Sequence, residues 1–159
     1  MKKIETVVFL VTILLGCSPD NNDEFADQII FGRIAGQCVG DCRELFLLTE
    51  QGLYSDSNTD TDFGDLIDVA DWENTTFESN SLSNEKFELA QHLLQIPEIL
   101  FESDDEFTEQ IWADIDYFIQ IKSNGNSKSF IFDKIAETAD LEIIQYMEDM
   151  IDVYDLLSE

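Results

Sequence analysis

The pair Asn124-Gly125 lies between two runs of alternating apolar residues, and it limits the fold of this chain more than any other feature. Both residue types tolerate the positive φ that a two-residue type I′ hairpin turn requires. With this pair as the loop, the cross-strand partners are Ile121 and Lys128, Ile119 and Phe130, and Tyr117 and Phe132. These partners share one face, so the turn chemistry and the hydrophobic register agree. The sequence therefore predicts an antiparallel hairpin over residues 112–134.

Three segments before this hairpin have the composition of strands. Residues 28–34 carry apolar side chains at consecutive positions, which is typical of a central strand with both faces buried. Residues 43–49 are predicted as a second strand, and a turn at 50–52 leads into a third short strand at 53–54. A further strand is predicted around residues 72–77. Polar residues dominate the segments 55–71 and 102–110, which are predicted as loops.

Two segments have the apolar period of a helix. Residues 84–95 follow Ser83 as N-cap and end before Pro97; the buried stripe is Phe87, Ala90, Leu93 and Leu94, and the solvent side is Glu88, Gln91, His92 and Gln95. Residues 139–157 have an apolar side of Ile143, Ile144, Met147, Met150, Ile151, Tyr154 and Leu157, opposite Glu142, Gln145, Glu148, Asp149 and Asp152. We therefore expect one α+β domain over residues 27–159, a mostly antiparallel sheet of about five strands packed against two helices.

The first seventeen residues have the order of an export signal. Lys2 and Lys3 precede an apolar run from Val7 to Leu15, which is too short to span a bilayer as a helix. Cys17 follows a small Gly16, and the whole segment resembles the lipobox of bacterial lipoproteins. The resemblance implies that residues 1–16 are a signal peptide and that Cys17 carries a lipid. The alternatives are an ordinary signal peptide cleaved elsewhere and a core helix.

Residues 18–24 are polar and unpatterned, which predicts a flexible acidic tether over residues 17–26. The acidic run after Cys17 resembles the export signal of surface lipoproteins in the Bacteroidetes group. We therefore expect an envelope protein, lipid-anchored in the outer membrane and either periplasmic or surface-exposed. The lipid on Cys17 would hold the protein to the membrane.

Acidic residues outnumber basic ones by 35 to 8 in the whole chain. Removal of residues 1–16 takes away two lysines and Glu5, which leaves 34 acidic and 6 basic residues and a formal charge of −28. Such a chain repels nucleic acid and anionic lipid head groups, so nucleic-acid binding is excluded. A hydrophobic content of 44% with 12 Phe argues for a folded core rather than disorder. The acidity is consistent with solubility at a cell surface, with binding of divalent cations, or with binding of a basic protein.

Cys38 and Cys42 are the thiols left once Cys17 is acylated. An even pair in an exported protein is usually a disulfide, here closing a short loop around Gly40. The alternatives are reduced thiols and a copper or redox site, because C-x-x-x-C resembles the thiolate pair of copper-delivery proteins of the thioredoxin-like fold. That family also needs a distal histidine on a loop, whereas the single histidine here, His92, is predicted mid-helix.

The motif Cys38-x-Gly40-x-Cys42, followed by an apolar strand and by Gly52 and Tyr54, resembles an uncharacterised domain of bacterial lipoproteins. The resemblance implies a strand, a glycine turn, a helix, a late hairpin and a C-terminal helix, and so matches residues 28–157. Arg43 stands where that domain usually has a proline. The resemblance implies architecture and location, and no activity.

Two groups of acidic residues are candidate sites. Asp56, Asn58, Asp60 and Asp62 supply oxygen at alternate positions, as a calcium loop does, but the positions for Gly and Glu of an EF-hand hold Thr61 and Ile67. We expect a solvated loop there, with a calcium site outside the EF-hand class as the alternative. Asp114 and Asp116 alternate along a predicted strand and are interpreted as its solvent side.

The functional expectation is a non-enzymatic binding or accessory module without cofactor or resident metal. The chain has one histidine, no serine elbow and no Gly-rich phosphate loop, so acid–base chemistry would depend on carboxylates alone. One alternative is an inhibitor or immunity-type lipoprotein that captures a basic protein. The other is a thiol- or copper-handling protein that uses Cys38 and Cys42.

Overall fold

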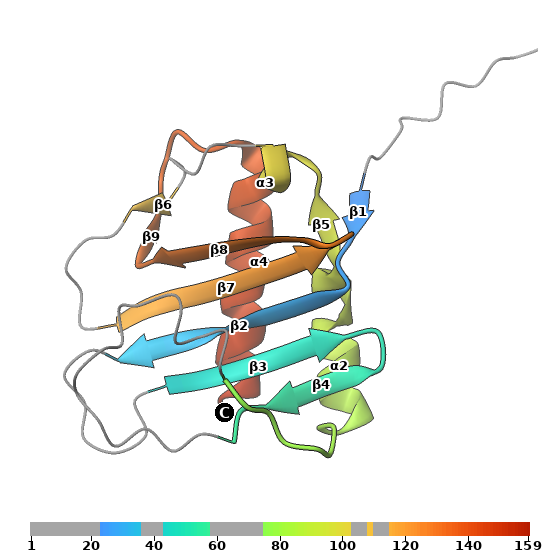
Figure 1. Ribbon diagram of the computed structural model, residues 1–159. Helices are drawn as coiled ribbons and strands as arrows, with labels where there is room; N and C mark the ends of the chain where they lie inside the picture. The colour runs from blue at the N-terminus through green and yellow to red at the C-terminus, as the bar shows by residue number, and fades with distance from the viewer. Residues whose placement is uncertain (1–22, 36–42, 58–74, 103–107, 110–114) are drawn as a thin grey trace, which may run out of the picture.

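The computed structural model of the chain describes residues 23–35, 43–57, 75–102, 108–109 and 115–159. Within these residues the largest sheet has the strand order β4-β3-β2-β7-β8, and every neighbouring pair is antiparallel (Figure 1). The strands are β2 (Gln28–Ala35), β3 (Arg43–Thr49), β4 (Gly52–Ser55), β7 (Ile115–Ser123) and β8 (Asn126–Phe132). The strand predicted as central, β2, lies in the middle of this sheet, as expected.

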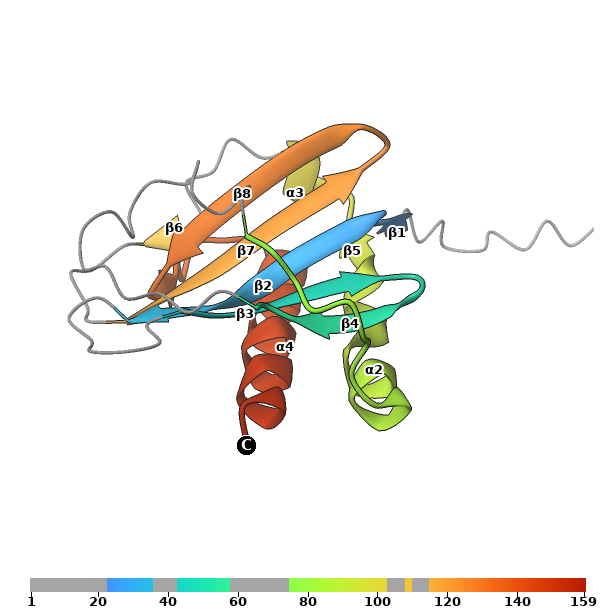
Figure 2. The same ribbon diagram turned by 60° about the horizontal axis from the view of Figure 1, so that its bottom comes forward.

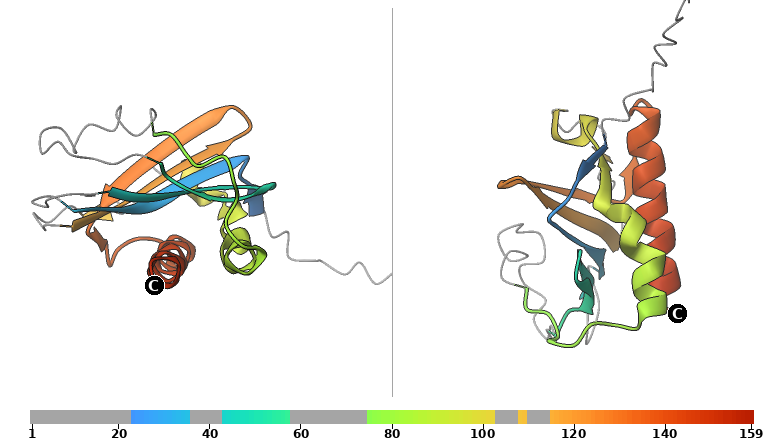
Figure 3. Two further views of the ribbon diagram at one scale, coloured as in Figure 1. Left: turned by 90° about the horizontal axis from the view of Figure 1, so that it is seen from below. Right: turned by 90° about the vertical axis from the view of Figure 1, so that its right-hand side faces the viewer.

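Helices cover one face of the sheet. They are α2 (Asn84–Ala90), which continues into the 3₁₀ helix η1 (Gln91–Leu94), the short α3 (Ile99–Glu102), and α4 (Leu141–Leu157). Figures 2 and 3 show α2 and α4 side by side against that face. Two small ribbons pair β1 (Asp23–Phe25) with β5 (Gln95–Pro97), and β6 (Thr108–Glu109) with β9 (Lys134–Ile135). The architecture is α+β, so this prediction is confirmed.

The hairpin forms as its turn residues predict. Asn124 has φ 50° and Gly125 has φ 80°, as a type I′ turn requires. The paired residues of β7 and β8 include Ile121 with Lys128, Ile119 with Phe130, and Tyr117 with Phe132. The predicted register is therefore confirmed.

The main core lies between the sheet and the helices. Phe31, Phe132, Met147 and Met150 are fully buried in it, and large apolar side chains of this kind each contribute about 1.5–3 kcal/mol on burial. The buried side of α4 consists of Ile143, Tyr146, Met147, Met150, Val153, Tyr154 and Leu157. Tyr146 and Val153 were not predicted as buried, whereas Ile144 and Ile151 are only partly covered. The contact surface of α4 is thus rotated slightly from the predicted stripe.

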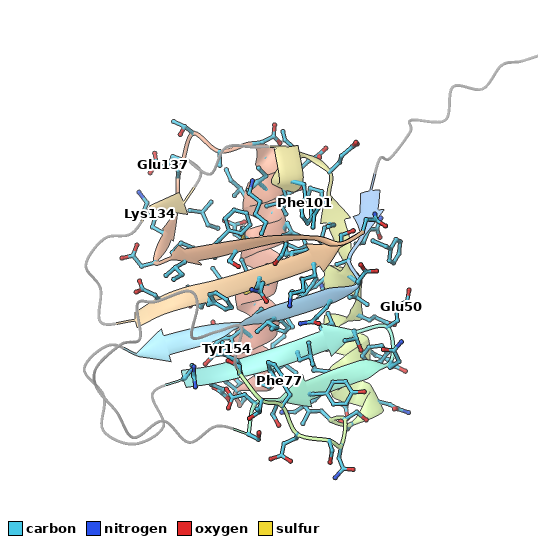
Figure 4. All side chains as sticks on the ribbon, in the orientation of Figure 1. Glu50, Phe77, Phe101, Lys134, Glu137 and Tyr154 are labelled. Atoms are coloured by element: carbon cyan, nitrogen blue, oxygen red, sulfur yellow. The ribbon has the colours of Figure 1, made fainter. Side chains whose placement is uncertain are left out.

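A smaller cluster lies on the opposite face of the sheet. Ile30, Leu45 and Phe118 are buried there, and Phe77 packs against them. Figure 4 shows Phe77 in front of the sheet and Tyr154 of α4 behind it. Because side chains alternate along a strand, the consecutive apolar residues of β2 supply both clusters.

Two sequence predictions are wrong at their edges. The predicted tether includes residues 23–26, but Asp23–Phe25 form β1, and buried Ala26 donates its N–H to the Leu94 carbonyl at 2.9 Å. Ser83 caps the first helix as predicted, since its Oγ accepts the Lys86 N–H at 3.3 Å. That helix tightens into η1 and ends at Leu94, because the next residues pair with β1 and need an extended backbone. Both corrections have one cause, the pairing of β1 with β5.

The two predicted loops are also partly ordered. Ser55 belongs to β4. Asp56 forms an isolated bridge with Phe77, and the next residue, Ser57, donates its N–H to the Thr76 carbonyl at 2.9 Å. The strand predicted at 72–77 is therefore present as a short bridge in its described part. In the segment 102–110, Glu102 ends α3 and Thr108–Glu109 form β6. These pairings join residues far apart in the chain, so local composition did not indicate them.

Candidate functional site

Most residues with a predicted chemical role lie outside the described part of the chain. They are Cys17, Cys38, Cys42, Asn58, Asp60, Asp62 and Asp114. The lipid anchor, the disulfide and the copper alternative therefore stay predictions. Arg43, which follows the second cysteine of the pair, begins β3 and is buried. Among the described helices, none is long and apolar enough to cross a membrane.

Asp56 ties the end of β4 to β3. Its Oδ2 accepts the Leu45 N–H at 2.8 Å, and its own N–H donates to the Leu45 carbonyl at 2.9 Å. One carboxylate oxygen is therefore committed to the backbone, which differs from the solvated loop predicted at this position. In the residues that the structure describes, no three His, Cys, Asp or Glu side chains are grouped to hold a metal ion.

The two other described residues of predicted interest occupy separate places. His92 is exposed in η1, as its position on the solvent side of the helix predicts. Asp116 is half-buried in β7, two residues before Phe118 and so on the same face of the sheet. The structure does not bring them together, since His92 belongs to the helix layer on the opposite face.

A polar cluster that the sequence did not predict joins the end of α4 to β3. The Tyr154 hydroxyl donates to Glu44 Oε2 at 2.8 Å, and the Ser158 hydroxyl donates to the same oxygen at 3.0 Å. The Tyr154 ring also meets Phe46 and Tyr117 in edge-on contacts, with centroids 6.1 and 6.2 Å apart. This cluster fixes the C-terminal turn of α4 on the sheet.

The phenols of this layer are held in their neutral form. Burial and the hydrogen bond to the Glu44 carboxylate raise the pKa of Tyr154 to about 12, against partial lowering by Ser158 and Arg33. Burial, and then the charge of Asp155, raises the pKa of Tyr117. Burial alone raises the pKa of Tyr146, whose hydroxyl donates to the Leu93 carbonyl at 2.9 Å.

We expect the domain to lose stability between pH 10 and pH 12. A raised folded pKa contributes stability that is complete below the unfolded value of 10.0 and is lost as pH rises through the folded value, about 12 for Tyr154. The Tyr154→Phe variant should start about 1 kcal/mol less stable, because a hydrogen bond is lost, and should then fall less steeply. Melting temperatures recorded from pH 8 to pH 12 test this. Parallel curves for both proteins would contradict it.

The outward side of α4 is acidic, with an apolar residue at each end. We call this set the acidic stripe; it consists of Leu141, Gln145, Glu148, Asp149, Asp152, Leu156 and Glu159, all exposed. Leu141 and Leu156 keep 66% and 52% of their surface exposed. At 1.5 Å per residue they lie about 22 Å apart along the helix. The predicted solvent side of this helix is thereby confirmed, whereas the exposed leucines were not predicted.

Few cations in the helix layer can neutralise the stripe. In the described helices the basic residues are Lys86 and His92. Lys86 Nζ donates to the Leu157 carbonyl at 2.7 Å, at the end of α4 where the helix dipole favours a positive charge. The cation is therefore used to join α2 to the C-terminus of α4, and the carboxylates further along α4 face solvent.

No family model matches the chain, and no curated protein or solved structure is significantly similar to it.

Proposed function

We propose that this chain is a lipid-anchored envelope protein whose domain is a non-enzymatic binding module. The observation that carries the proposal is the N-terminal segment, in which two lysines, an apolar run and Gly16-Cys17 follow in the register of a lipobox. Each methylene of an acyl chain buried in a membrane contributes about 0.8 kcal/mol, so two or three chains hold the domain firmly. The single histidine and the lack of a nucleophile or phosphate-loop motif support binding over catalysis.

The acidic stripe supports a basic protein as the partner. The carboxylates of Glu148, Asp149 and Asp152 lie on one helix whose buried side packs on the sheet, so a partner meets a preorganised surface. Charged side chains around an interface steer association, and exposed apolar residues add contact area. Leu156 next to Asp152 and Glu159 provides both kinds of contact. The domain then acts as an inhibitor or immunity-type protein, which captures a basic protein.

Neutralising the stripe should weaken partner binding about tenfold at low salt, because three attractive charges are removed. The variant is Glu148→Gln, Asp149→Asn and Asp152→Asn, three exposed residues of α4. Wild-type and variant domains are used as bait in envelope extract, the retained basic protein is identified and purified, and its Kd is measured by calorimetry at two salt concentrations.

The matched control removes the same net charge elsewhere. Glu50, Glu78 and Glu98 are exposed and lie outside the stripe, so Glu50→Gln, Glu78→Gln and Glu98→Gln should leave the Kd near that of wild type. Equal weakening by both triple variants would show that total charge matters rather than the stripe. Failure to retain any basic protein in stoichiometric amount would contradict the proposal of a basic partner. The lipid anchor is tested separately, by the substitution of Cys17.

A further inference from the structure

The first described strand begins only a few residues after the cysteine that would carry the lipid. From Cys17 to Asp23, the first residue of β1, the chain advances six residues. Even a fully extended chain of that length spans only about 20 Å. If Cys17 is acylated, the end of the domain that carries β1 is therefore held at the membrane surface. This step rests on the proposed function, since it requires the lipid anchor.

That end of the domain carries an exposed aromatic side chain. Phe25 keeps 62% of its surface exposed, although its strand pairs with β5. Its carbonyl accepts a hydrogen bond from the Ser123 hydroxyl at 3.0 Å, and Ser123 is fully buried. The backbone around Phe25 is thus fixed while the ring points to solvent. Because its backbone is already ordered, Phe25 would lose only side-chain rotamer entropy on contact with another surface.

The tip of the main hairpin is attached to the same end. The Asn124 N–H donates to Asp27 Oδ2 at 2.9 Å, and the Asp27 N–H donates to the Lys122 carbonyl at 2.8 Å. Figure 1 shows the β7–β8 turn next to β1, where the chain enters the domain. Phe25 and the Asn124-Gly125 turn therefore belong to one rigid surface, which we call the anchor end.

We propose that the anchor end rests on a phospholipid surface and that the Phe25 ring enters its interfacial layer. Aromatic and aliphatic side chains bind there by burying apolar area at the boundary of head groups and acyl chains. A zwitterionic surface is the one this acidic chain tolerates, because anionic head groups repel it.

This orientation places the other end of the sheet away from the membrane. β2 runs from Gln28 at the anchor end to Ala35, which is about 25 Å along an extended strand. The strand ends Ala35 and Arg43 lie at that distant end, since Arg43 pairs with Ile34. The C-terminus of α4 also lies away from β1 (Figure 1), so Leu156 and its stripe neighbours stay open to a soluble partner.

The test places a single tryptophan at the anchor end of the acylated protein. The native Trp72 and Trp112 are replaced by Phe, and Phe25→Trp is compared with the control Leu156→Trp at the far end of α4. Each protein is reconstituted through its lipid into phosphatidylcholine–phosphatidylethanolamine vesicles with brominated acyl chains. We expect quenching of about twofold for the tryptophan at position 25 and none for the control, because bromine quenches only at the depth of the bilayer.

A second measurement needs no substitution in the folded domain. Hydrogen exchange of the acylated wild-type protein on vesicles is compared with that of Cys17→Ser in solution, and residues 122–127 should exchange more slowly on vesicles while residues 148–158 are unchanged. Equal quenching at both positions, or unchanged exchange at 122–127, would overturn the orientation even with the protein bound. Absence of the acyl mass on Cys17 would instead overturn the lipid anchor, and the orientation with it.

Discussion

Replacing Cys17 by serine should abolish acylation and membrane retention of the mature protein. The thiol is the nucleophile for lipid transfer in the lipobox interpretation, and a serine hydroxyl does not replace it. Without acyl chains, the contribution of about 0.8 kcal/mol per buried methylene is lost, and an acidic domain has no electrostatic attraction to lipid. Cell fractionation, acyl-chain labelling and sensitivity of processing to globomycin measure the result. The folded domain should keep its melting temperature, since Cys17 precedes β1, the first described strand.

The matched control is Cys38→Ser, which changes another cysteine outside the lipobox. This variant should be acylated and retained like wild type, so the two substitutions separate the anchor from thiol chemistry in general. Acyl label on the Cys17→Ser protein, or its normal retention as a processed form, would refute the lipoprotein assignment.

Gly32→Ala should destabilise the domain strongly, and more than Gly125→Ala does. Gly32 lies in the central strand with φ 156°, between its partners Leu45 and Phe118. A Cβ at this position would overlap the Glu44 carbonyl oxygen and lie 2.9 Å from Leu45 Cα. Both atoms belong to the backbone of β3, so they can move only if the β2–β3 pairing is distorted. We expect a loss of about 3 kcal/mol, which is a large fraction of the stability of a domain.

Gly125→Ala is the matched control for the glycine prediction. Gly125 has φ 80°, but apart from its own residue and its two chain neighbours no atom lies within 4 Å of a Cβ built there. The substitution should therefore cost only the left-handed backbone conformation, about 1–2 kcal/mol. Urea unfolding of both variants gives the comparison. A Gly32→Ala domain that is as stable as the Gly125→Ala domain would contradict this prediction, because it would show that the β3 backbone shifts at little cost to accommodate the methyl group.

Local chemistry made a large part of the fold predictable. Asn124 and Gly125 determine the turn, and the turn determines the register of the strands on either side, because hairpin partners are close in sequence. The same holds for Ser83, which caps α2 three residues from its hydrogen-bond donor. Residues 28–34 have apolar side chains on both faces, which is enough to predict a central strand.

The candidate surfaces were less predictable for a physical reason. Glu148, Asp149 and Asp152 were correctly expected on the solvent side of a helix, since periodicity determines which residues share a face. Periodicity does not reveal that Leu156 stays exposed, because exposure depends on which neighbouring elements reach that position.

The sequence by itself determined the hairpin register, the central strand and the two main helices, because each depends on residues a few positions apart. Only the tertiary structure decided that Phe25 belongs to a strand rather than a tether, since β5 pairs with it seventy residues later. It also decided that Tyr154 donates to Glu44 across 110 positions, and that Lys86 reaches Leu157. Such contacts form when the packed core brings distant segments together, and no local pattern in the chain encodes which partners meet.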